Sequence, residues 1–508
     1  MGPHANHLIG AIEARAPAGT KTFLETPAGA RLSYADLKAA AARYAGALAA
    51  LGVRPGDRVA LQVEKSVPAL LLYLAAVRAG AVFLPLNPAY TPTEMAYFLS
   101  DAEPRVLICD PAKKGALAEA ASAAGVEHVE TLDGLGAGSI ADRAGQAGDD
   151  FSDLPRRPDD LAALLYTSGT TGRPKGAMLS HENLSSNAQA LVDAWAFTQS
   201  DVILHALPVF HTHGLFVATN VALFAGGSLL YLPRFDADLV IANLPRATVM
   251  MGVPTYYSRL LATDGFTREA AAHMRLFISG SAPLSAELHR AFEARSGHAI
   301  LERYGMSETS MNTTNPYEGE RRPGTVGMPL AGVELRIADP ETGAALAEGE
   351  TGMIELKGPN VFAGYWRKEA ETKKAFRDDG FFVTGDLGRI DEDGYLAIAG
   401  RETDLIISGG LNVYPAEVEA AIDEIEGVVE CAVIGCPHSD FGEGVVAVVA
   451  RAPGAGLAQG DVIDALKDRL AGFKRPKRVV FVDQLPRNAM GKIEKAKLRD
   501  AYRNILGD

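Results

Sequence analysis

The chain contains, directly after an apolar run, the segment Leu165-Tyr166-Thr167-Ser168-Gly169-Thr170-Thr171-Gly172-Arg173-Pro174-Lys175-Gly176. Glycines let backbone N–H groups approach an anion closely, hydroxyls donate further hydrogen bonds, and a lysine adds positive charge. The spacing is not that of a Walker loop, because Lys175 is neither preceded by Gly nor followed by Ser or Thr. A polar surface turn is the alternative, but the crowding of these residue types predicts a loop that holds phosphate groups.

On both sides of this loop, short apolar runs alternate with helical patterns, which predicts parallel sheets covered by helices. Strands are expected at 58–63, 81–86, 105–110, 161–166, 202–207, 228–232, 248–253, 275–279 and 299–304. Helices are expected between them, for example at 67–78, 92–100 and 284–296. The Ala/Gly-rich stretch 111–147 has a weak pattern, so we expect a surface excursion there.

The pattern changes toward the C-terminus. Closer glycine spacing over 349–400 predicts short antiparallel strands, and residues after 401 form a compact alternating unit. In that unit we expect helices at 415–425, 460–470 and 494–502 and strands at 428–434, 445–451 and 478–482. The predicted fold class is therefore α/β, with parallel-rich sheets and a small antiparallel region in a large N-terminal domain, followed by a small α+β domain.

Composition excludes several classes of function. The 508 residues suffice for two or three domains, and 49 basic against 63 acidic residues give a net charge of -14. This balance argues against nucleic-acid binding and against adsorption to anionic membranes. Three cysteines are too few for a disulfide framework. The 32 residues from 202 to 233 carry no Asp, Glu, Lys or Arg, but their Pro, His and Gly residues favour buried structure over a membrane span. We expect a cytoplasmic protein.

Three further segments, together with the phosphate loop, resemble the signatures of the adenylate-forming superfamily in their expected order. They are Tyr304-Gly305-Met306-Ser307-Glu308, Thr384-Gly385-Asp386 with Gly400-Arg401, and Pro486-Arg487-Asn488-Ala489-Met490-Gly491-Lys492. Ser307 stands where the family more often has Thr. The superfamily comprises acyl-CoA synthetases, luciferases and peptide-synthetase adenylation domains, and the resemblance covers nearly the whole chain. It implies that the protein activates an acid with ATP and then transfers the acyl group.

The resemblance implies roles that have physical reasons. Attack of a carboxylate on the α-phosphate brings two anions together, so Lys492 is expected to supply positive charge there. Glu308 and Thr167 would hold Mg²⁺, which prefers hard oxygen ligands. Asp386 would accept the ribose hydroxyls with Arg401 beside it. The remaining residues expected at the nucleotide are Ser281, Ala282 and Pro283, which resemble the segment that flanks adenine, and Tyr304, Gly305, Met306 and Ser307.

The resemblance also implies how the chain is divided. Residues 1–400 would form the adenylation domain, 401–404 a hinge, and 405–508 a small mobile domain that carries the catalytic lysine. Thr403 stands where family members usually have Asp or Lys. Coenzyme A is the expected acceptor, because only six residues follow the last predicted helix and no carrier domain is seen. The residues implied in CoA binding are Ser408, Gly409, Gly410 and Arg475.

Two arginines indicate which kind of acid the protein would use as its substrate. A short dicarboxylate needs a cation for its second carboxylate, and the planar fork of arginine suits that group. Along its whole length the chain looks most like the malonyl-CoA synthetases, a resemblance that implies Arg234 and Arg303 at the distal carboxylate. We also expect His211 near the acyl group and Ser279 at the acid. Arg303 could instead form a structural salt bridge, Arg234 could lie on the surface, and His211 could simply be packed.

The implied reaction is that of malonate, ATP and CoA to malonyl-CoA, AMP and diphosphate. Alternatives are a ligase for methylmalonate, a thioether-propionate or propionate, or an adenylate-forming enzyme that does not use CoA. All these ligands are anionic, and the segment 474–500 concentrates nine basic against three acidic residues in the small domain. Lys492 is also a plausible target for a regulatory lysine acylation enzyme, because loss of its charge would stop the first step.

Overall fold

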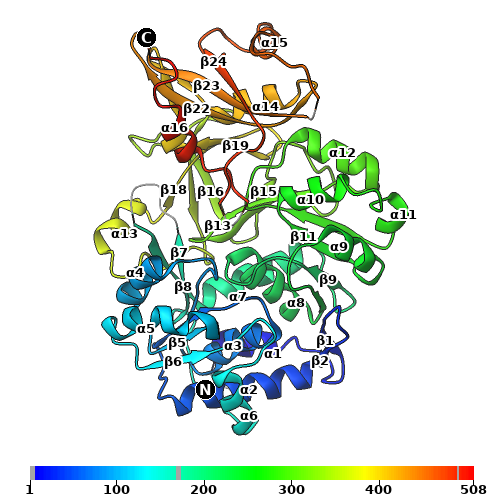
Figure 1. Cartoon of the computed structure of the whole chain (residues 1–508), viewed down its shortest axis with the longest axis vertical. Coiled ribbons are helices and arrows are strands. Elements are labelled where there is room, and N and C mark those ends of the chain that lie inside the picture. The colour runs from blue at the N-terminus through cyan, green and yellow to red at the C-terminus, as the bar shows by residue number, and fades with distance from the viewer. Residues whose placement is uncertain (1–5, 168–172, 453, 489–490, 508) are drawn as a thin grey trace.

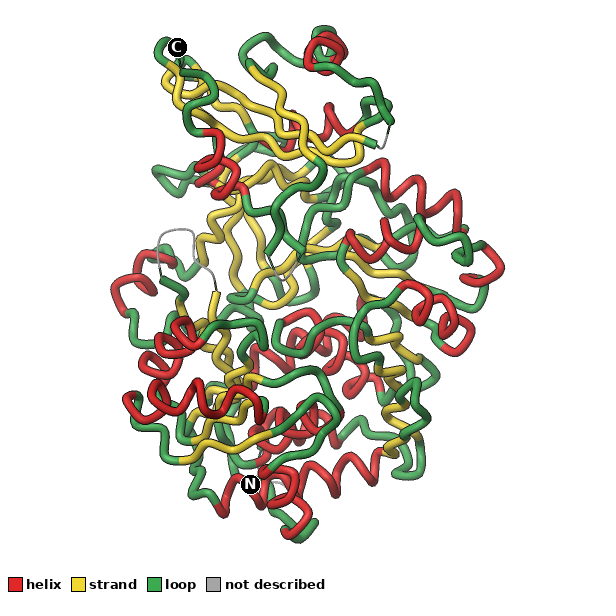
Figure 2. Tube along the Cα trace, in the orientation of Figure 1, coloured by secondary structure: helices red, strands yellow, loops and turns green. Residues whose placement is uncertain are grey.

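The computed structural model describes residues 6–167, 173–452, 454–488 and 491–507. The chain builds a large lower body from its N-terminal four-fifths and a smaller upper body from its C-terminal residues (Figure 1). Figure 2 shows that strands run through the interior of both bodies and that helices lie mainly on the outside of the lower one. Within the described residues the strands form four sheets.

The first sheet of the lower body has the strand order β6-β5-β3-β4-β7-β8. Its strands are β3 (Arg58–Gln62), β4 (Val82–Pro85), β5 (Val106–Cys109), β6 (His128–Thr131), β7 (Leu161–Thr167) and β8 (Lys175–Ser180). All neighbours pair in parallel except β7 and β8, which form an antiparallel pair whose register joins Thr167 to Lys175. The predicted phosphate loop is therefore the connection between β7 and β8.

The second sheet of the lower body has the order β15-β14-β13-β12-β11-β9-β10-β1-β2. Its strands are β1 (Thr22–Glu25), β2 (Arg31–Ser33), β9 (Val202–His205), β10 (Ser228–Tyr231), β11 (Val249–Gly252), β12 (Leu276–Ser279), β13 (Leu301–Met306), β14 (Ser310–Thr314) and β15 (Met328–Pro329). The run from β13 to β1 is parallel, and antiparallel strands close both edges.

Helices cover these sheets, and local sequence signals mark where they begin. The Thr91 and Glu94 side chains form a capping box at the start of α4, and Ser66 caps α3 ahead of a proline in its first turn. The helices of the lower body are α1 (His7–Glu13), α2 (Tyr34–Ala50), α3 (Val67–Arg78), α4 (Pro92–Ala102), α5 (Lys114–Ala123), α6 (Ser139–Gln146), α7 (His181–Ala194), α8 (Asn220–Ala225), α9 (Ala237–Asn243), α10 (Pro254–Leu261), α11 (Arg268–Ala271), α12 (Ala286–Ser296) and α13 (Glu369–Ala375).

The main core lies between the two large sheets, with α3 inside it. Tyr73 of α3 is fully buried, with its ring 5.5 Å from that of Phe83 on β4 and 5.6 Å from that of Phe216. Its hydroxyl donates a hydrogen bond of 3.1 Å to the Asn220 side chain. A helix packed on two sides has no solvent face, which explains why α3 is apolar all round.

The other two sheets are formed by the C-terminal part of the chain. An antiparallel sheet contains β16 (Glu334–Ala338), β17 (Gly352–Lys357), β18 (Phe382–Ile390) and β19 (Leu396–Arg401). The upper body holds a mixed sheet of β20 (Ile406–Ser408), β21 (Leu411–Val413), β22 (Val428–His438), β23 (Gly442–Arg451) and β24 (Arg478–Val482), with helices α14 (Pro415–Asp423), α15 (Gln459–Ala465) and α16 (Lys495–Tyr502). This α+β arrangement confirms the predicted fold class.

The expectation for 111–147 was wrong. This stretch forms α5, the edge strand β6 and α6, and its apolar residues enter the core, including Leu117 and Ile140. The pattern was weak because β6 is a short edge strand with polar residues. Its buried Glu130 forms an ion pair of 3.0 Å with Arg143 and also accepts a hydrogen bond from the Ser139 hydroxyl.

The uncharged run 202–233 is buried inside the lower body, as expected. It forms β9, a π-helix (η2, His213–Thr219), α8 and β10. The π-helix was not foreseen, and such wide turns occur preferentially at functional sites. Within the described residues, no helix is both long enough and apolar enough to cross a membrane.

Candidate functional site

The candidate site lies where the parallel strands of the second large sheet end. Open parallel sheets bind ligands beyond the carboxyl ends of their strands. Ser279 is the last residue of β12, Arg303 lies on β13 beside it, and His205 ends β9. The antiparallel sheet and the last turn before α16 approach the same region, so residues far apart in sequence meet there.

The structure describes the two ends of the phosphate loop, at Thr167 and from Arg173 onward. Residues Ser168, Gly169, Thr170, Thr171 and Gly172 lie outside the described part of the chain. The Lys175 Nζ lies 5.1 Å from the centre of the Tyr365 ring, and the Tyr365 hydroxyl donates a hydrogen bond of 3.1 Å to Glu308. Glu308 is buried, and desolvation raises its pKa. A buried carboxylate beside a phosphate loop, with one hydrogen-bond donor and no ion pair among the described residues, suits a cation.

Asp386 stands at the centre of the predicted ribose site. One oxygen accepts a hydrogen bond of 2.5 Å from the Tyr304 hydroxyl, and the other lies 2.6 Å from the Arg401 Nε. Asp386 and Arg401 are register partners on β18 and β19. The Asp386 carboxylate raises the pKa of Arg401, and burial followed by the same carboxylate raises that of Tyr304. The structure thus brings these three predicted nucleotide residues together.

Lys492 enters the same cleft from the upper body. Its backbone N–H donates 3.0 Å to the Asn488 side chain, and the neighbouring Gly491 packs near Thr255 at the start of α10. The Lys492 side chain remains open to solvent, although protein surrounds it on most sides. This partial desolvation, followed by repulsion from Arg401, lowers its pKa. The predicted catalytic lysine is therefore placed beside the predicted ribose site.

Arg303 carries a buried positive charge that lacks hydrogen-bond partners at two of its nitrogen atoms. Its side chain is 2% exposed, and neither its Nε nor its Nη2 has a hydrogen-bond partner. Among the described residues, none forms an ion pair with it, so the alternative of a structural salt bridge does not hold. Desolvation lowers the pKa of Arg303 to about 9, which still leaves the guanidinium protonated at neutral pH. A buried cation without an anion is costly, and it therefore points to an anionic ligand.

Other unpaired polar atoms surround this guanidinium. Buried atoms without a partner include Nδ1 of His211, Nε2 of His213 and the hydroxyl of Ser279. Burial, then repulsion by Arg303 and Lys492, lowers the pKa of His211 to about 4, so this ring is neutral and lies near both cations. Two of the predicted acid residues, His211 and Arg303, are thus brought together near Lys492, whereas Ser279 lies opposite Glu302 at the end of β12.

Arg234 is placed differently. It is exposed on the loop that follows β10, which agrees with the alternative of a surface arginine. Its neighbour Phe235 stacks on Tyr256 with ring centres 4.0 Å apart. No described interaction joins Arg234 to Arg303, so its role at the distal carboxylate stays a prediction.

The segment predicted to flank adenine leaves the end of β12 directly. Ser281 has a φ of 70°, and its hydroxyl lies 3.3 Å from Nδ1 of His213. Ala282 is partly buried and Pro283 is exposed, and Gly305, Met306 and Ser307 are partly buried. These residues are therefore not part of the fully buried core.

The residues predicted for CoA lie apart from this centre. Gly409 and Gly410 have φ values of 61° and 78° and form the two-residue turn between β20 and β21, which requires positive φ at both positions. Ser408 is buried, and Arg475 is partly buried near Gly472. Thr403 is exposed in the turn η4 (Glu402–Asp404). The glycine pair is thus explained by the hairpin, and its contact with CoA stays a prediction.

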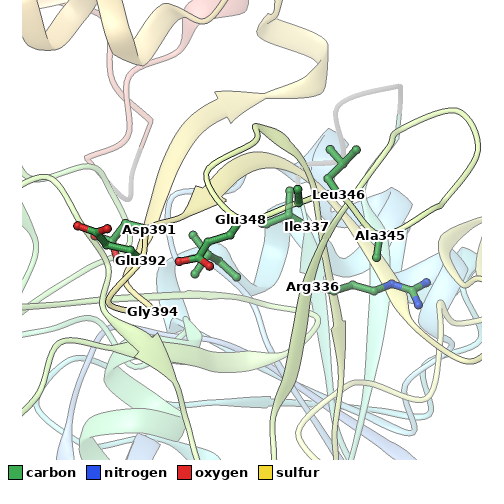
Figure 3. A pocket seen from close by; sticks show the side chains of 10 residues that line it. Arg336, Ile337, Ala345, Leu346, Glu348, Asp391, Glu392 and Gly394 are labelled. Atoms are coloured by element: carbon green, nitrogen blue, oxygen red, sulfur yellow. The ribbon is translucent and has the colours of Figure 1, made fainter.

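A hollow of about 360 Å³ on the antiparallel sheet is not this site. Figure 3 shows Glu348, Asp391 and Glu392 toward one side of it and the Arg336 guanidinium on the other. Arg336 is already paired with Glu355 at 2.8 Å and Asp379 at 2.6 Å. An acidic hollow whose arginine is occupied does not suit anionic substrates.

Sequence reasoning missed several residues here. His213, which lies near Arg303 and Ser281, was not among the predicted site residues. Glu302 is buried and Lys65 is partly buried behind the site. The Lys65 Nζ lies 2.9 Å from His205 Nδ1, and Glu302 accepts 3.1 Å from the Leu284 N–H. A lysine or glutamate in a strand or loop gives no sequence signal of burial, so these positions could not be found without the fold.

Comparisons with known proteins agree with this geometry. The family model for AMP-binding enzymes matches residues 13–366, and the model for the C-terminal domain of AMP-binding enzymes matches 417–492. Feruloyl-CoA synthase from an Amycolatopsis species is 37% identical over 93% of this chain and 94% of its own. Malonate–CoA ligase from Arabidopsis thaliana is 34% identical over 89% of this chain and 79% of its own.

Crystal structures of MatB from Rhodopseudomonas palustris are also similar. They are 57% identical to this chain and cover 99% of both chains, with a TM-score of 0.97 for the ATP-bound form and 0.87 for the apo form. The whole chain therefore superimposes better on the ATP-bound form. The superfamily and the fold predicted from sequence are both confirmed: this chain belongs to the AMP-binding, adenylate-forming enzymes.

Proposed function

We propose that this chain is a malonate–CoA ligase, which converts malonate, ATP and CoA to malonyl-CoA, AMP and diphosphate. The matches support an AMP-forming acid–CoA ligase. The malonate–CoA ligases of Arabidopsis thaliana and Mus musculus, each 34% identical to this chain, support malonate as the acid.

The observation that carries the choice of acid is the unpaired guanidinium of Arg303. Its free Nε and Nη2 offer two parallel N–H donors, the arrangement that binds one carboxylate with both oxygens. Malonate has a second carboxylate to place there while the first reacts near Lys492. The neutral His211 and the Ser279 hydroxyl add hydrogen bonds without adding charge.

The same observation weighs against aryl and long-chain acids. Feruloyl-CoA synthase is similar over most of the chain, but an aryl or alkyl tail would leave the Arg303 cation buried and unpaired. That cost amounts to several kcal/mol. Methylmalonate satisfies the guanidinium equally well and is the second candidate.

ATP is the nucleotide, and this chain supplies groups for each of its parts. Asp386 accepts the ribose hydroxyls, and the segment from Ser281 to Pro283 lies against adenine. The loop between Thr167 and Lys175 holds the phosphates. Glu308 and Thr167 would hold Mg²⁺, which fits because Glu308 is a buried oxygen donor without an ion pair among the described residues. When bound, this cation neutralises charge on the phosphates.

Adenylation joins a malonate carboxylate oxygen to the α-phosphorus, and the bond to the β-phosphate oxygen breaks. Both reactants are anions, so the step needs a cation placed where negative charge accumulates. Lys492 is the residue so placed, since it lies near Arg401, Asp386 and His211. Its protonated ammonium lowers the repulsion between the carboxylate and the phosphate.

Thioester formation requires another arrangement. We infer that residues 1–400 form the adenylation domain and that residues 405–508 turn about 401–404. This turn withdraws Lys492 and brings the hairpin of Ser408, Gly409 and Gly410, with Arg475, to the CoA side. The CoA sulfur then attacks the acyl carbon, and AMP leaves. Thr403 is exposed in the turn between the domains, where a change of backbone angles meets little resistance.

The test is a panel of acids assayed with ATP and CoA. AMP release is measured for malonate, methylmalonate, propionate, hexanoate and ferulate, and the mass of each product is determined. We expect malonate to give the highest kcat/KM and a product with the mass of malonyl-CoA. A preference for propionate or ferulate would contradict the proposed acid, and an adenylate without thioester would contradict the proposed acceptor. Arg234→Ala in the same panel tests the second arginine.

A further inference from the structure

Gly280, the residue after β12, lies directly against the Arg303 guanidinium. A Cβ atom built on Gly280 would lie 2.4 Å from Cζ, 2.5 Å from Nη1 and 2.6 Å from Nε of Arg303. Uncharged heavy atoms in contact are separated by about 3.5–4.0 Å, so these distances are not compatible with a side chain at position 280. The guanidinium therefore occupies the volume that any other residue at position 280 would fill.

Backbone conformation does not require glycine at this position. Gly280 is not among the residues with positive φ, whereas its neighbour Ser281 adopts φ 70° with a side chain present. The three heavy atoms nearest to the virtual Cβ all belong to the Arg303 guanidinium. Space for this one group is thus the physical reason for a glycine here.

The other neighbours limit where the guanidinium can go. Arg303 is buried, Tyr257 of α10 lies near enough to interact electrostatically with it, and the Tyr257 hydroxyl is held by the Ile278 carbonyl at 2.5 Å. Because the guanidinium ends a flexible side chain, a Cβ at position 280 would move it rather than move a backbone segment. The fold should survive, but the two free N–H donors would no longer point to the same place.

We propose that Gly280 determines which acids the protein uses. Because Gly280 has no side chain, the Arg303 guanidinium has the space to lie where it can bind the second carboxylate of the acid. This inference rests on the proposed function. Gly280 makes no polar contact with the substrate itself and acts through Arg303, so it is a positioning residue. An alanine at position 280 should therefore harm dicarboxylates and leave monocarboxylates and ATP largely unaffected.

The experiment compares Gly280→Ala, Arg303→Ala and the double variant with malonate and propionate. For Gly280→Ala we expect kcat/KM for malonate to fall by about 30-fold or more. Propionate kcat/KM and the KM for ATP should change by less than about 3-fold. The double variant should be no worse with malonate than Arg303→Ala alone, because the clash disappears with the guanidinium.

The matched control is Gly265→Ala. Gly265 also lacks a positive φ, and its virtual Cβ would lie 3.7 Å from an Ile241 carbon, an ordinary contact. It should keep wild-type kinetics and melting temperature. If Gly280→Ala fails to fold, recovery of folding in the double variant would still support the clash with Arg303, and no recovery would overturn it.

Two outcomes contradict the inference. They are an unchanged ratio of malonate to propionate kcat/KM, and a raised KM for ATP as the main effect. Losses that multiply in the double variant would show that Gly280 acts independently of Arg303, which also overturns it. A wild-type protein that uses no malonate would instead overturn the proposed function, and this assignment with it.

Discussion

Replacement of Arg303 by methionine should affect catalysis and stability in opposite directions. Methionine keeps a long unbranched side chain and so avoids a large cavity, but it removes the charge and all N–H donors. Arg303 is 2% exposed and has two N–H donors without a partner in the protein. We therefore expect its charge and these donors to act mainly on a bound ligand.

The expected loss can be worked out from these facts. Hydrogen bonds that involve a charged group contribute about 1.5–3 kcal/mol each, and removing one partner of a buried ion pair costs about 3–5 kcal/mol. At 1.36 kcal/mol for each factor of ten, kcat/KM for malonate should fall by roughly 10²- to 10⁴-fold. Propionate cannot reach the guanidinium with a carboxylate, so its kcat/KM should change by less than about 3-fold.

The ligand-free protein should become more stable. It carries a buried cation whose pKa burial lowers to about 9, which means that the protein environment disfavours the charge. Replacing buried ions by apolar residues is often neutral or stabilising by about 1–4 kcal/mol. Arg303→Met should therefore unfold at a higher temperature than wild type when no substrate is present.

The assay is AMP release at varied malonate or propionate, with thermal unfolding measured on the same preparations. Arg303→Lys is the matched control, because it keeps a charge but not the planar fork, and it should fall between wild type and Arg303→Met with malonate. The reasoning would be refuted if malonate and propionate lost activity equally, or if Arg303→Met lowered the stability of the free protein.

Three other predictions concern single groups. Lys492→Ala should abolish malonate-dependent exchange between ATP and diphosphate yet still form malonyl-CoA from supplied malonyl-adenylate; equal loss of both half-reactions would contradict its role. Because burial and repulsion by Arg303 lower the pKa of His211 to about 4, His211→Asn should leave the shape of the malonate pH profile unchanged between about pH 6 and 8, and a lost inflection there would contradict this. Burial raises the pKa of Glu302 from 4.5 to about 8, so its contribution to stability is full below pH 4.5 and is lost as the pH rises through 8. Glu302→Gln should therefore gain stability relative to wild type as the pH rises from about 4.5 to 8 in urea unfolding, and a constant difference over this range would show that Glu302 does not titrate in this way.

Much of the fold could be predicted from the sequence because its strands are buried on both faces. The apolar runs at β3, β4 and β5 and the helix α3 lie within two residues of where periodicity placed them. The stretch 111–147 was misjudged, since a polar edge strand has neither an apolar run nor an alternating pattern. Edge strands owe their place to pairing with a neighbour, and within the described part of the chain β6 pairs with β5 alone.

The candidate site, like the fold, could be predicted only in part from the sequence. Motifs led to Asp386, Glu308 and Lys492, and the structure brings these together with Tyr304 and Arg401. What sequence alone does not reveal is which polar atoms end up without a partner. Whether Arg303 forms a salt bridge depends on the whole neighbourhood of β13, and the space under its guanidinium depends on a glycine 23 positions earlier in the chain.

The ion pair between Arg401 and Asp386 has a mechanical consequence for the proposed turn about 401–404. The moving part of the chain would begin at a residue whose side chain is paired with the carboxylate proposed to accept the ribose hydroxyls. Residues close to a rotation axis move little, and residues farther from it move more. In the proposed turn the nucleoside would therefore stay nearly in place while Lys492 moves over a larger distance. Such an axis would let the enzyme exchange its catalytic groups without releasing the reactive acyl-adenylate.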